Sequence, residues 1–370
     1  MPDTHAILSA SSSKMWLNCP PSALLNAKLP ESSSPYAQQG TDAHSLCEFK
    51  LHQALGHKVR DPTEDLQNYD EEMENCANDY TAYVLSQIPE NAQVFIEERL
   101  DFSKWVPGGF GTGDCIIIGD GTLKIIDFKY GLGVLVSAEQ NTQMMLYALG
   151  AIDTYDMLYD IKEVQMTIFQ PRRQNVSTYT ISKEELLKWA EEYLIPRAKL
   201  AAEGKGEFHA GSHCQFCKIK ATCRKRAEHH MELARYEFAK PETLTDEEVE
   251  DILDKVDGLS GWANDVKEYA LQQALSGKKW KRWKVVEGRS NRKYTDEKAV
   301  ADKVQEAGFD PYDHKLQGVT AMSKLLGKKK FDELLGGLVY KPKGKPTLVD
   351  IGDKRPEINT ADEDFKEELS

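Results

Sequence analysis

The stretch Asp114-Cys-Ile-Ile-Ile-Gly-Asp-Gly-Thr-Leu-Lys-Ile-Ile-Asp127-Phe-Lys129 decides the fold of this chain. Its central dipeptide Asp120-Gly121 is typical of a two-residue hairpin turn, and apolar runs flank it on both sides. We therefore expect two strands, 114–118 and 122–129. With Asp120 and Gly121 as the turn, Asp114 lies directly opposite Asp127.

This register brings two carboxylates and a lysine together. Cross-strand partners have Cβ atoms about 4.5–5.5 Å apart, and alternation along the strand puts Lys129 on the same face as Asp127. Carboxylate oxygens are the ligands that Mg²⁺ or Mn²⁺ prefers, and a lysine beside them stabilises charge on a phosphate or orients a water molecule. The pattern predicts a metal site for phosphate chemistry; the alternative is a salt bridge on the hairpin surface.

Two other segments offer ligands for the same site. In a helix predicted over 36–54, His44 and Glu48 lie one turn apart on one face, so His44 is a candidate third metal ligand or an ordinary polar residue. A strand is expected over 93–100, and Glu97 and Glu98 in its second half are equally placed to add a carboxylate.

A helix is expected after the hairpin. Ser137 and Gln140 have capping-box spacing, which predicts a helix from there to about Gly150. Gln143 and Tyr147 then share one face, where an amide and a phenol either hold a phosphodiester or pack the helix.

Further elements follow the same patterns. A helix is expected over 72–87, strands over 164–169 and 176–181, a helix from Ser182 to about Ala202 ended by Gly204, and a helical stretch capped by Thr245 and interrupted near Gly258 and Gly261.

The seven cysteines argue against a secreted disulfide scaffold, because their number is odd. Cys214-x2-Cys217-x5-Cys223 has the spacing of a metal site that needs a fourth ligand. His209 or His213 would complete a zinc site, whereas Cys19 would complete a four-cysteine iron–sulfur site. Spacing alone leaves both open, and the other three cysteines, Cys47, Cys76 and Cys115, are expected to be buried free thiols.

Composition sets the limits of the function. The 370 residues are 40% hydrophobic, which suits two or three folded domains and excludes a fully disordered chain. No apolar run is long enough to span a membrane and no signal peptide is evident, so we expect a cytoplasmic protein without a membrane partner. The net charge of −13 means that nucleic-acid binding depends on local patches.

One such patch is the segment 278–293, which carries eight basic residues and one acid around Trp280 and Trp283. Aromatic rings stack on bases while Lys and Arg meet phosphates. We expect a core over 1–238, a mainly helical accessory domain with this segment over 239–340, and a flexible acidic-ended tail over 341–370.

The order of these motifs resembles that of RecB-like nucleases of the PD-(D/E)XK superfamily, over roughly residues 6–226. One cysteine followed by a late triplet is similar to the iron–sulfur variant in AddB-type and CRISPR-adaptation exonucleases. The whole chain also resembles an uncharacterised family carried by phages and prophages. The motifs, in chain order, are Leu8-Ser9-Ala10-Ser11 to Trp16 with Cys19-Pro20, Gln39-Gly40-x3-His44, Gly113-Asp114, Asp127-x-Lys129 and Gln143-x3-Tyr147. In the fourth motif, Asp127 stands where many members of the superfamily have Glu.

The resemblance implies a fold class and a role for each matched position. The fold would be α/β, a PD-(D/E)XK restriction-endonuclease-like core with a mixed central sheet flanked by helices, plus a mainly helical C-terminal extension. His44, Asp114 and Asp127 would bind Mg²⁺ or Mn²⁺, with the Phe128 carbonyl as an extra ligand, and Lys129 would be the catalytic lysine. Gln143 and Tyr147 would position DNA. A [4Fe–4S] cluster would be held by Cys19, Cys214, Cys217 and Cys223.

We therefore expect a metal-dependent DNA exonuclease or related deoxyribonuclease that hydrolyses phosphodiester bonds, in phage recombination or DNA processing. Its partners would be DNA and, by the same resemblance, an annealing protein, a single-strand-binding protein or a helicase. Two alternatives stay open, a non-catalytic nucleic-acid-binding module on a nuclease fold and a zinc-stabilised interaction protein.

Overall fold

The computed structural model describes residues 6–30, 35–233, 244–286, 296–306, 312 and 318–340. The chain forms two compact units, Met1–Val285 and Val286–Ser370. The boundary expected near residue 238 lies outside the described residues and stays a prediction, as does the tail over 341–370.

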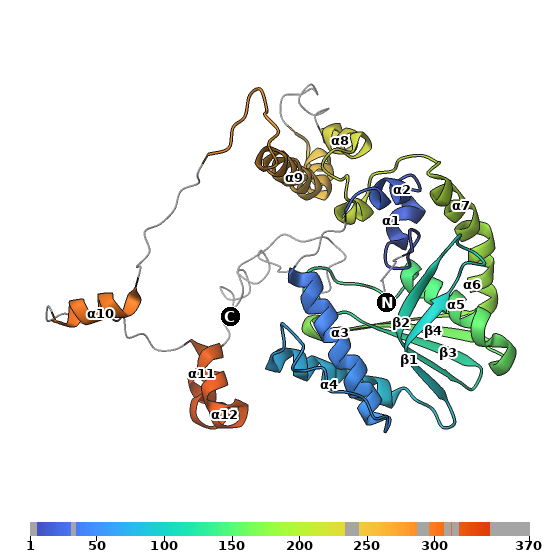
Figure 1. The fold of residues 1–370 in the computed structure, drawn as a ribbon, viewed down its shortest axis with the longest axis horizontal. Coiled ribbons are helices and arrows are strands. Elements are labelled where there is room, and N and C mark those ends of the chain that lie inside the picture. Colours follow the sequence, from blue (N-terminus) through green and yellow to red (C-terminus); the bar gives the residue numbers. More distant parts are fainter. Residues whose placement is uncertain are drawn as a thin grey trace, which may run out of the picture. The chain divides into compact units, whose positions relative to one another are not determined.

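The first unit is built on a mixed five-stranded sheet (Figure 1) in the order β1-β2-β3-β4-β5. Only β3 and β4 run parallel; the other neighbours are antiparallel. The strands are β1 Gln93–Asp101, β2 Phe110–Gly119, β3 Thr122–Phe128, β4 Glu163–Gln170 and β5 Asn175–Ser182.

The central hairpin has the register that the sequence predicts. Gly119 pairs with Thr122 and Cys115 with Ile126, while Asp120 and Gly121 form the turn with φ of 52° and 73°. A turn of this kind needs positive φ at both central residues, which Gly adopts freely and Asp tolerates. The turn therefore fixes the register that brings Asp114 level with Asp127.

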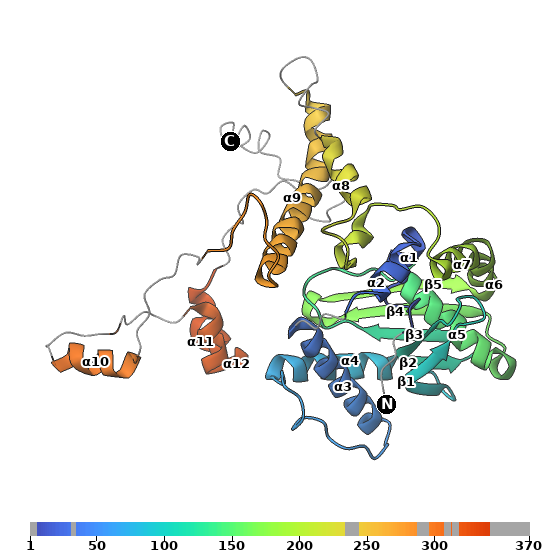
Figure 2. The same ribbon diagram turned by 45° about the horizontal axis from the view of Figure 1, so that its top comes forward.

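Helices cover both faces of the sheet (Figures 1 and 2), because the central strands β2, β3 and β4 are apolar on both sides. Helices α3 (Pro35–Ala54) and α4 (Glu71–Ser86) pack on one face, around Leu46, Tyr80 and Phe128. The other face packs on α5 (Thr142–Tyr159), which is the crossover that the parallel strands β3 and β4 require. The same layer contains α1 (Ser13–Asn18), α2 (Ser22–Ala27), α6 (Lys183–Trp189), a π-helical turn Ala190–Leu194 and α7 (Ile195–Glu203).

The cap expected for α5 is wrong. The helix begins at Thr142, where the Asn141 side chain accepts from the backbone N–H groups of Gln143 and Met144. Ser137 instead accepts from the N–H of Glu139 and lies in the preceding loop. The helix also continues beyond Gly150 to Tyr159. Gly150 lets the helix approach β1 closely, because a Cβ at this position would lie 3.0 Å from the Leu100 side chain.

The capping box of Ser182 and Glu185 and the left-handed Gly204 at the end of α7 are as predicted. The chain then passes through a short 3₁₀ turn, Ser212–Phe216, to α8 (Arg224–Met231), which contacts α9 (Asp246–Leu275). The interruption expected in α9 is wrong, because this helix runs unbroken through Gly258 and Gly261 from the capping box of Thr245.

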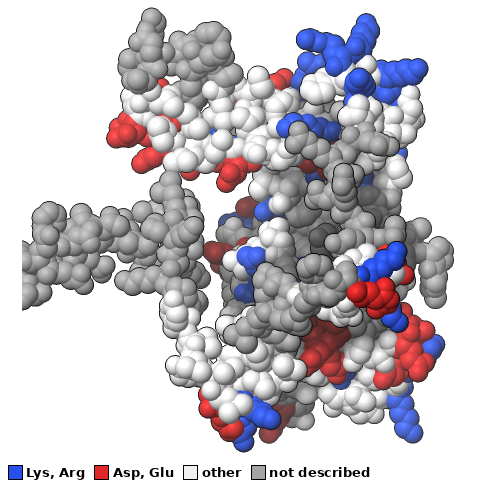
Figure 3. Space-filling model, turned by 90° about the vertical axis from the view of Figure 1, so that its left-hand side faces the viewer, with Lys and Arg blue, Asp and Glu red and all other residues white. Residues whose placement is uncertain are grey.

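The described part of the second unit contains helices α10 (Glu297–Glu306), α11 (Val319–Leu326) and α12 (Lys328–Leu335), the last followed by a 3₁₀ turn, Gly336–Leu338. None of the helices in the described ranges combines the length and apolar composition needed to cross a bilayer. On the face drawn in Figure 3, Lys and Arg side chains gather at the upper right, whereas Asp and Glu form several smaller groups.

Candidate functional site

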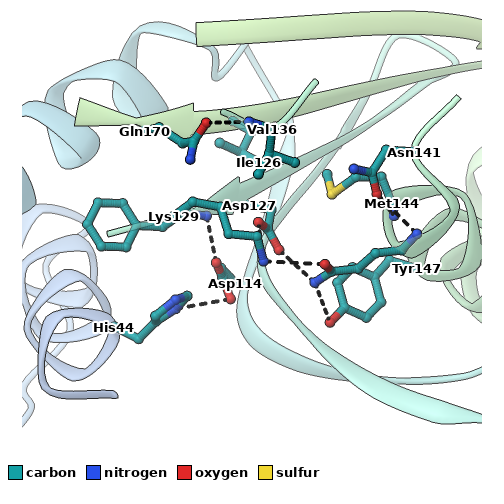
Figure 4. Close-up of polar contacts among 12 residues, drawn as sticks. His44, Asp114, Ile126, Asp127, Lys129, Val136, Asn141, Met144, Tyr147 and Gln170 are labelled. Atoms are coloured by element: carbon teal, nitrogen blue, oxygen red, sulfur yellow. Dashed lines mark hydrogen bonds and ion pairs between the residues drawn. The ribbon is translucent and has the colours of Figure 1, made fainter. Parts of the chain in front are cut away.

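The hairpin holds Asp114 at the edge of a polar cluster inside the first unit (Figure 4). One carboxylate oxygen, Oδ2, accepts a 2.7 Å hydrogen bond from the backbone N–H of Phe128 on the neighbouring strand. The other, Oδ1, lies 3.4 Å from Nδ1 of His44, whose ring on α3 packs edge-on against Phe128. The strand pairing and the helix packing together orient Asp114.

Glu97 joins this cluster because β1 is distorted at that position. The neighbours Ile96 and Glu98 pair regularly with Cys115 and Gly113, but Glu97 itself has φ of 49°. A left-handed conformation is unusual for a residue with a side chain, and strain of this kind concentrates at functional sites. Glu98, the equal candidate from sequence, instead accepts a hydrogen bond from Tyr155.

His44, Glu97 and Asp114 form a candidate metal centre. One ligand atom from each lies within 4.8 Å of the others, and no other such set of three occurs among the residues that the structure describes. Two carboxylates and an imidazole suit Mn²⁺ or Mg²⁺, whose ligands sit about 2.1 Å from the ion in an octahedron. The donor set and its spacing therefore fit a divalent cation.

The electrostatics of the centre show an excess of negative charge. Burial and then the charge of Asp114 raise the pKa of Glu97 to about 8. Burial alone would lower the pKa of His44, but Asp114 raises it to about 9 overall. Burial opposes ionisation of Asp114, yet His44, Lys129 and the Phe128 N–H lower its pKa below the usual range. The centre therefore holds protons that a bound cation would displace.

Asp127 belongs to a second group beside the candidate metal centre. Its Oδ2 lies 2.9 Å from Nζ of Lys129, and its Oδ1 accepts a 3.2 Å hydrogen bond from Nε2 of Gln143. Gln143 also accepts from Lys129 (3.3 Å) and donates to the Tyr147 hydroxyl (3.2 Å). Gln143 therefore bridges the acid and the lysine, and Tyr147 holds Gln143 in place.

Burial dominates the ionisation of this second group. It raises the pKa of Asp127, with the charge of Asp114 adding to the effect and Lys129 opposing it. Burial opposes the charge of Lys129 as well, but Asp127 and Asp114 raise its pKa overall. A charged ammonium is thereby favoured beside the two carboxylates of Asp127 and Asp114.

The structure gathers most of the residues singled out from sequence. Asp127 turns toward Lys129 and is not one of the three close ligands. Glu48 lies one turn beyond His44, and its charge helps to raise the pKa of Glu97. The roles of Glu48, of the Phe128 carbonyl, and of Gln143 and Tyr147 toward DNA stay predictions.

A second cluster of ligands is formed by the cysteines. Cys19, Cys214, Cys217 and Cys223 line one small pocket, although Cys19 is far from the others in sequence. His209 and His213 line it too, and the His213 ring is hydrogen-bonded to the His209 carbonyl. The other three cysteines are buried in the core beside the sheet and carry no disulfide, as predicted.

The spacing of the thiols bears on which metal fits. A tetrahedral zinc site with Zn–S bonds of about 2.3 Å brings its ligands within about 3.8 Å of one another. No three Cys or His ligand atoms lie within 4.8 Å in the described part of this pocket. Four thiols around one pocket match the ligand set of a [4Fe–4S] cluster, because the cysteine sulfurs that bind such a cluster lie farther apart than those around a single zinc ion.

Sequence reasoning missed Asn26, a buried residue beside this pocket. Its Nδ2 donates to Sγ of Cys217 at 3.4 Å, and its Oδ1 accepts from the backbone N–H of Lys218 at 2.6 Å. Nothing in the spacing of Asn26 from the cysteines signals this contact, because 191 residues separate it from Cys217.

The chain belongs to the family described as "Protein of unknown function (DUF2800)", whose model matches residues 5–356. Among solved structures, the chain is similar to the crystal structure of SSO0001, with 16% sequence identity, 50% of this chain and 97% of that chain covered, and a TM-score of 0.22.

Proposed function

We propose that this member of the DUF2800 family is a metal-dependent deoxyribonuclease with a PD-(D/E)XK-type core. One observation carries the proposal: the ligand atoms of His44, Glu97 and Asp114 converge within 4.8 Å, beside a Lys129 that is held 2.9 Å from Asp127. The mixed five-stranded sheet flanked by helices is compatible with that core, and the motif order supports it.

The chemistry of the centre suits phosphodiester hydrolysis. A divalent cation held by His44, Glu97 and Asp114 would activate a water molecule and offset charge on the phosphate. Lys129 supplies a fixed positive charge where negative charge grows in the transition state. Asp127 and Gln143 hold its ammonium group in position, so that little reorganisation is needed during the reaction.

The cysteine pocket supports a structural [4Fe–4S] cluster. Cys19 precedes α2, whereas the other three cysteines follow the last helix of the sheet layer. A cluster bound by all four would link the N-terminal segment to residues 214–223, and metal binding would add directly to folding stability. We propose an iron–sulfur cluster rather than zinc, because no three Cys or His ligand atoms of this pocket lie within 4.8 Å of one another among the described residues.

DNA is the proposed substrate, and the basic segment that begins at Lys278 gives it a second contact. Trp283 is 81% exposed, and the neighbouring Lys281, Arg282 and Lys284 are exposed as well. This arrangement also favours a second candidate function, a non-catalytic DNA-binding module. A role in phage recombination beside an annealing protein, a single-strand-binding protein or a helicase rests on the sequence resemblance alone.

The test is DNA degradation by anaerobically purified protein with Mn²⁺ or Mg²⁺, with Lys129→Ala run in parallel. Loss of the lysine should lower the rate by at least about 100-fold, because one preorganised charge stabiliser contributes that much. Equal cleavage by both proteins would refute the assignment. Salt-sensitive DNA binding without any cleavage would favour the binding module.

A further inference from the structure

Residues 130–136 form a loop, here called the apolar loop, that directly follows Lys129 and leads toward α5. Its aliphatic side chains Leu132, Val134 and Leu135 are 48%, 46% and 59% exposed. The connection ends at α5, whose first turn carries Gln143, so both of its ends supply a side chain that contacts Asp127. The apolar loop therefore borders the proposed reaction centre.

The backbone of the apolar loop is held by polar side chains from the ends of β4 and β5. Gln170, which is buried, donates to the carbonyl of Val134 at 3.0 Å and accepts from the N–H of Val136 at 2.9 Å (Figure 4 shows the second contact). Arg173 donates to the carbonyl of Leu132 at 2.7 Å. The loop thus keeps its shape without burying its own aliphatic side chains, and they remain available to a ligand.

We propose that the apolar loop contacts nucleobases beside the scissile phosphate, and that the preferred substrate is therefore a DNA strand whose bases are unpaired there. The inference rests on the proposed nuclease function and extends it to the form of the substrate.

The reason is what each form of DNA exposes. A stacked duplex presents mainly sugars and phosphates outside its grooves, against which aliphatic side chains gain little. Unpaired bases present apolar faces, and aliphatic side chains of DNA-binding proteins insert between base steps once they are unstacked. Arg173 adds an exposed guanidinium next to Leu132, and a cation beside an apolar contact suits a single strand.

A cycle of protein and DNA changes tests this contact. The protein variant carries Leu132→Ser and Leu135→Ser together, and Leu135→Ser alone is a second, milder variant. The control is Met157→Ser, because Met157 is 98% exposed on α5 but lies 14 residues, about 21 Å of helix, beyond Gln143. The DNA change replaces alternate nucleotides of one single strand by abasic sugars. Binding is measured in the Lys129→Ala background, and Mn²⁺-dependent cleavage with Lys129 intact; a blunt duplex of the same sequence is included.

The double Ser variant should bind the intact strand about tenfold more weakly, a loss of about 1.4 kcal/mol, and the abasic strand should weaken binding by the intact loop to a similar degree. Together the two changes should weaken binding no further, and Met157→Ser should match the intact surface. Fully multiplicative losses, unchanged binding by the variant, or faster cleavage of the duplex than of the single strand would each overturn the contact. If the loop variants cleave DNA as well as the protein with an intact loop does, this inference alone is overturned. If no protein cleaves or binds DNA, the nuclease proposal is overturned with it.

Discussion

Glu97→Gln gives the sharpest test of the candidate metal centre, because it should change protein stability in opposite directions with and without metal. The pKa of Glu97 is about 8 in the folded protein, against an ordinary value of 4.5 in the unfolded chain. The folded state therefore holds the proton more tightly, and stability falls as pH rises from 4.5 to about 8, after which the loss is constant. Between pH 4.5 and pH 7 the pH rises by about 2.5 units, and at about 1.4 kcal/mol per unit the free energy of unfolding falls by at most about 3 kcal/mol.

Glutamine has the same shape and no charge, so it removes this penalty. In the presence of a chelator, the Glu97→Gln protein should be more stable than the parent by up to about 3 kcal/mol at pH 7, with the difference shrinking toward zero near pH 4.5. For a unit of this size, that difference corresponds to roughly 5–10 °C in the unfolding midpoint. Added Mn²⁺ should then stabilise the parent protein and leave the variant almost unchanged, because a carboxylate ligand is missing.

The assay is thermal unfolding followed by circular dichroism, at several pH values, with chelator or with Mn²⁺. The matched control is Glu98→Gln, since Glu98 is the adjacent acid and bonds to Tyr155 outside the centre. A Glu97→Gln protein that is less stable than the parent in chelator at pH 7, or that keeps the full Mn²⁺ effect, would refute the reasoning about charge excess at this site.

Three other predictions follow from the same contacts. Mn²⁺ affinity should rise steeply between pH 6 and 8, by up to about 100-fold per pH unit, because His44 and Glu97, with pKa values of about 9 and 8, must both lose a proton. Calorimetry in buffers of different ionisation enthalpy counts the protons released, and an affinity that does not change with pH would contradict the ligand set. Gly111→Ala should cost about 1–3 kcal/mol and reduce cleavage, since its Cβ would lie 2.8 Å from the Tyr147 ring that supports Gln143, whereas Gly261→Ala, which meets nothing within 4 Å, should not lower stability in the same unfolding measurement. If the cysteines hold the proposed [4Fe–4S] cluster, Asn26→Ala should speed the loss of its visible absorbance in air by removing the hydrogen bond to Cys217, and an unchanged rate would show that this bond does not protect the cluster.

Local chemistry was enough to predict the central hairpin. Positive φ at Asp120 and Gly121 is a property of those two residues, and the alternation of side chains along a strand sets which residues share a face. Asp127 and Lys129 therefore share one face whatever surrounds them. The capping boxes at Ser182 and Thr245 were readable for the same reason, since both partners lie within one helical turn.

The wrong predictions fall where local signals competed. Ser137 and Asn141 both offer an N-cap for α5, and the choice is made outside the helix, because Ser177 of β5 accepts from the N–H of Ala138 and holds the preceding loop on the sheet. In α9, two glycines weaken the helix by about 1 kcal/mol each. Packing against α8, with His230 stacked on Trp262, accompanies the unbroken helix.

The sequence by itself determined which side chains meet within a hairpin or a turn of helix, because their spacing is set by backbone geometry over a few residues. Only the tertiary structure decided which distant groups converge. It selected Glu97 over Glu98 through the left-handed backbone of β1, placed His44 of α3 against Asp114, and brought Cys19 to the pocket of the late cysteines. Those choices depend on how the helices pack on the two faces of the sheet, and packing is a property of the whole core rather than of any one segment.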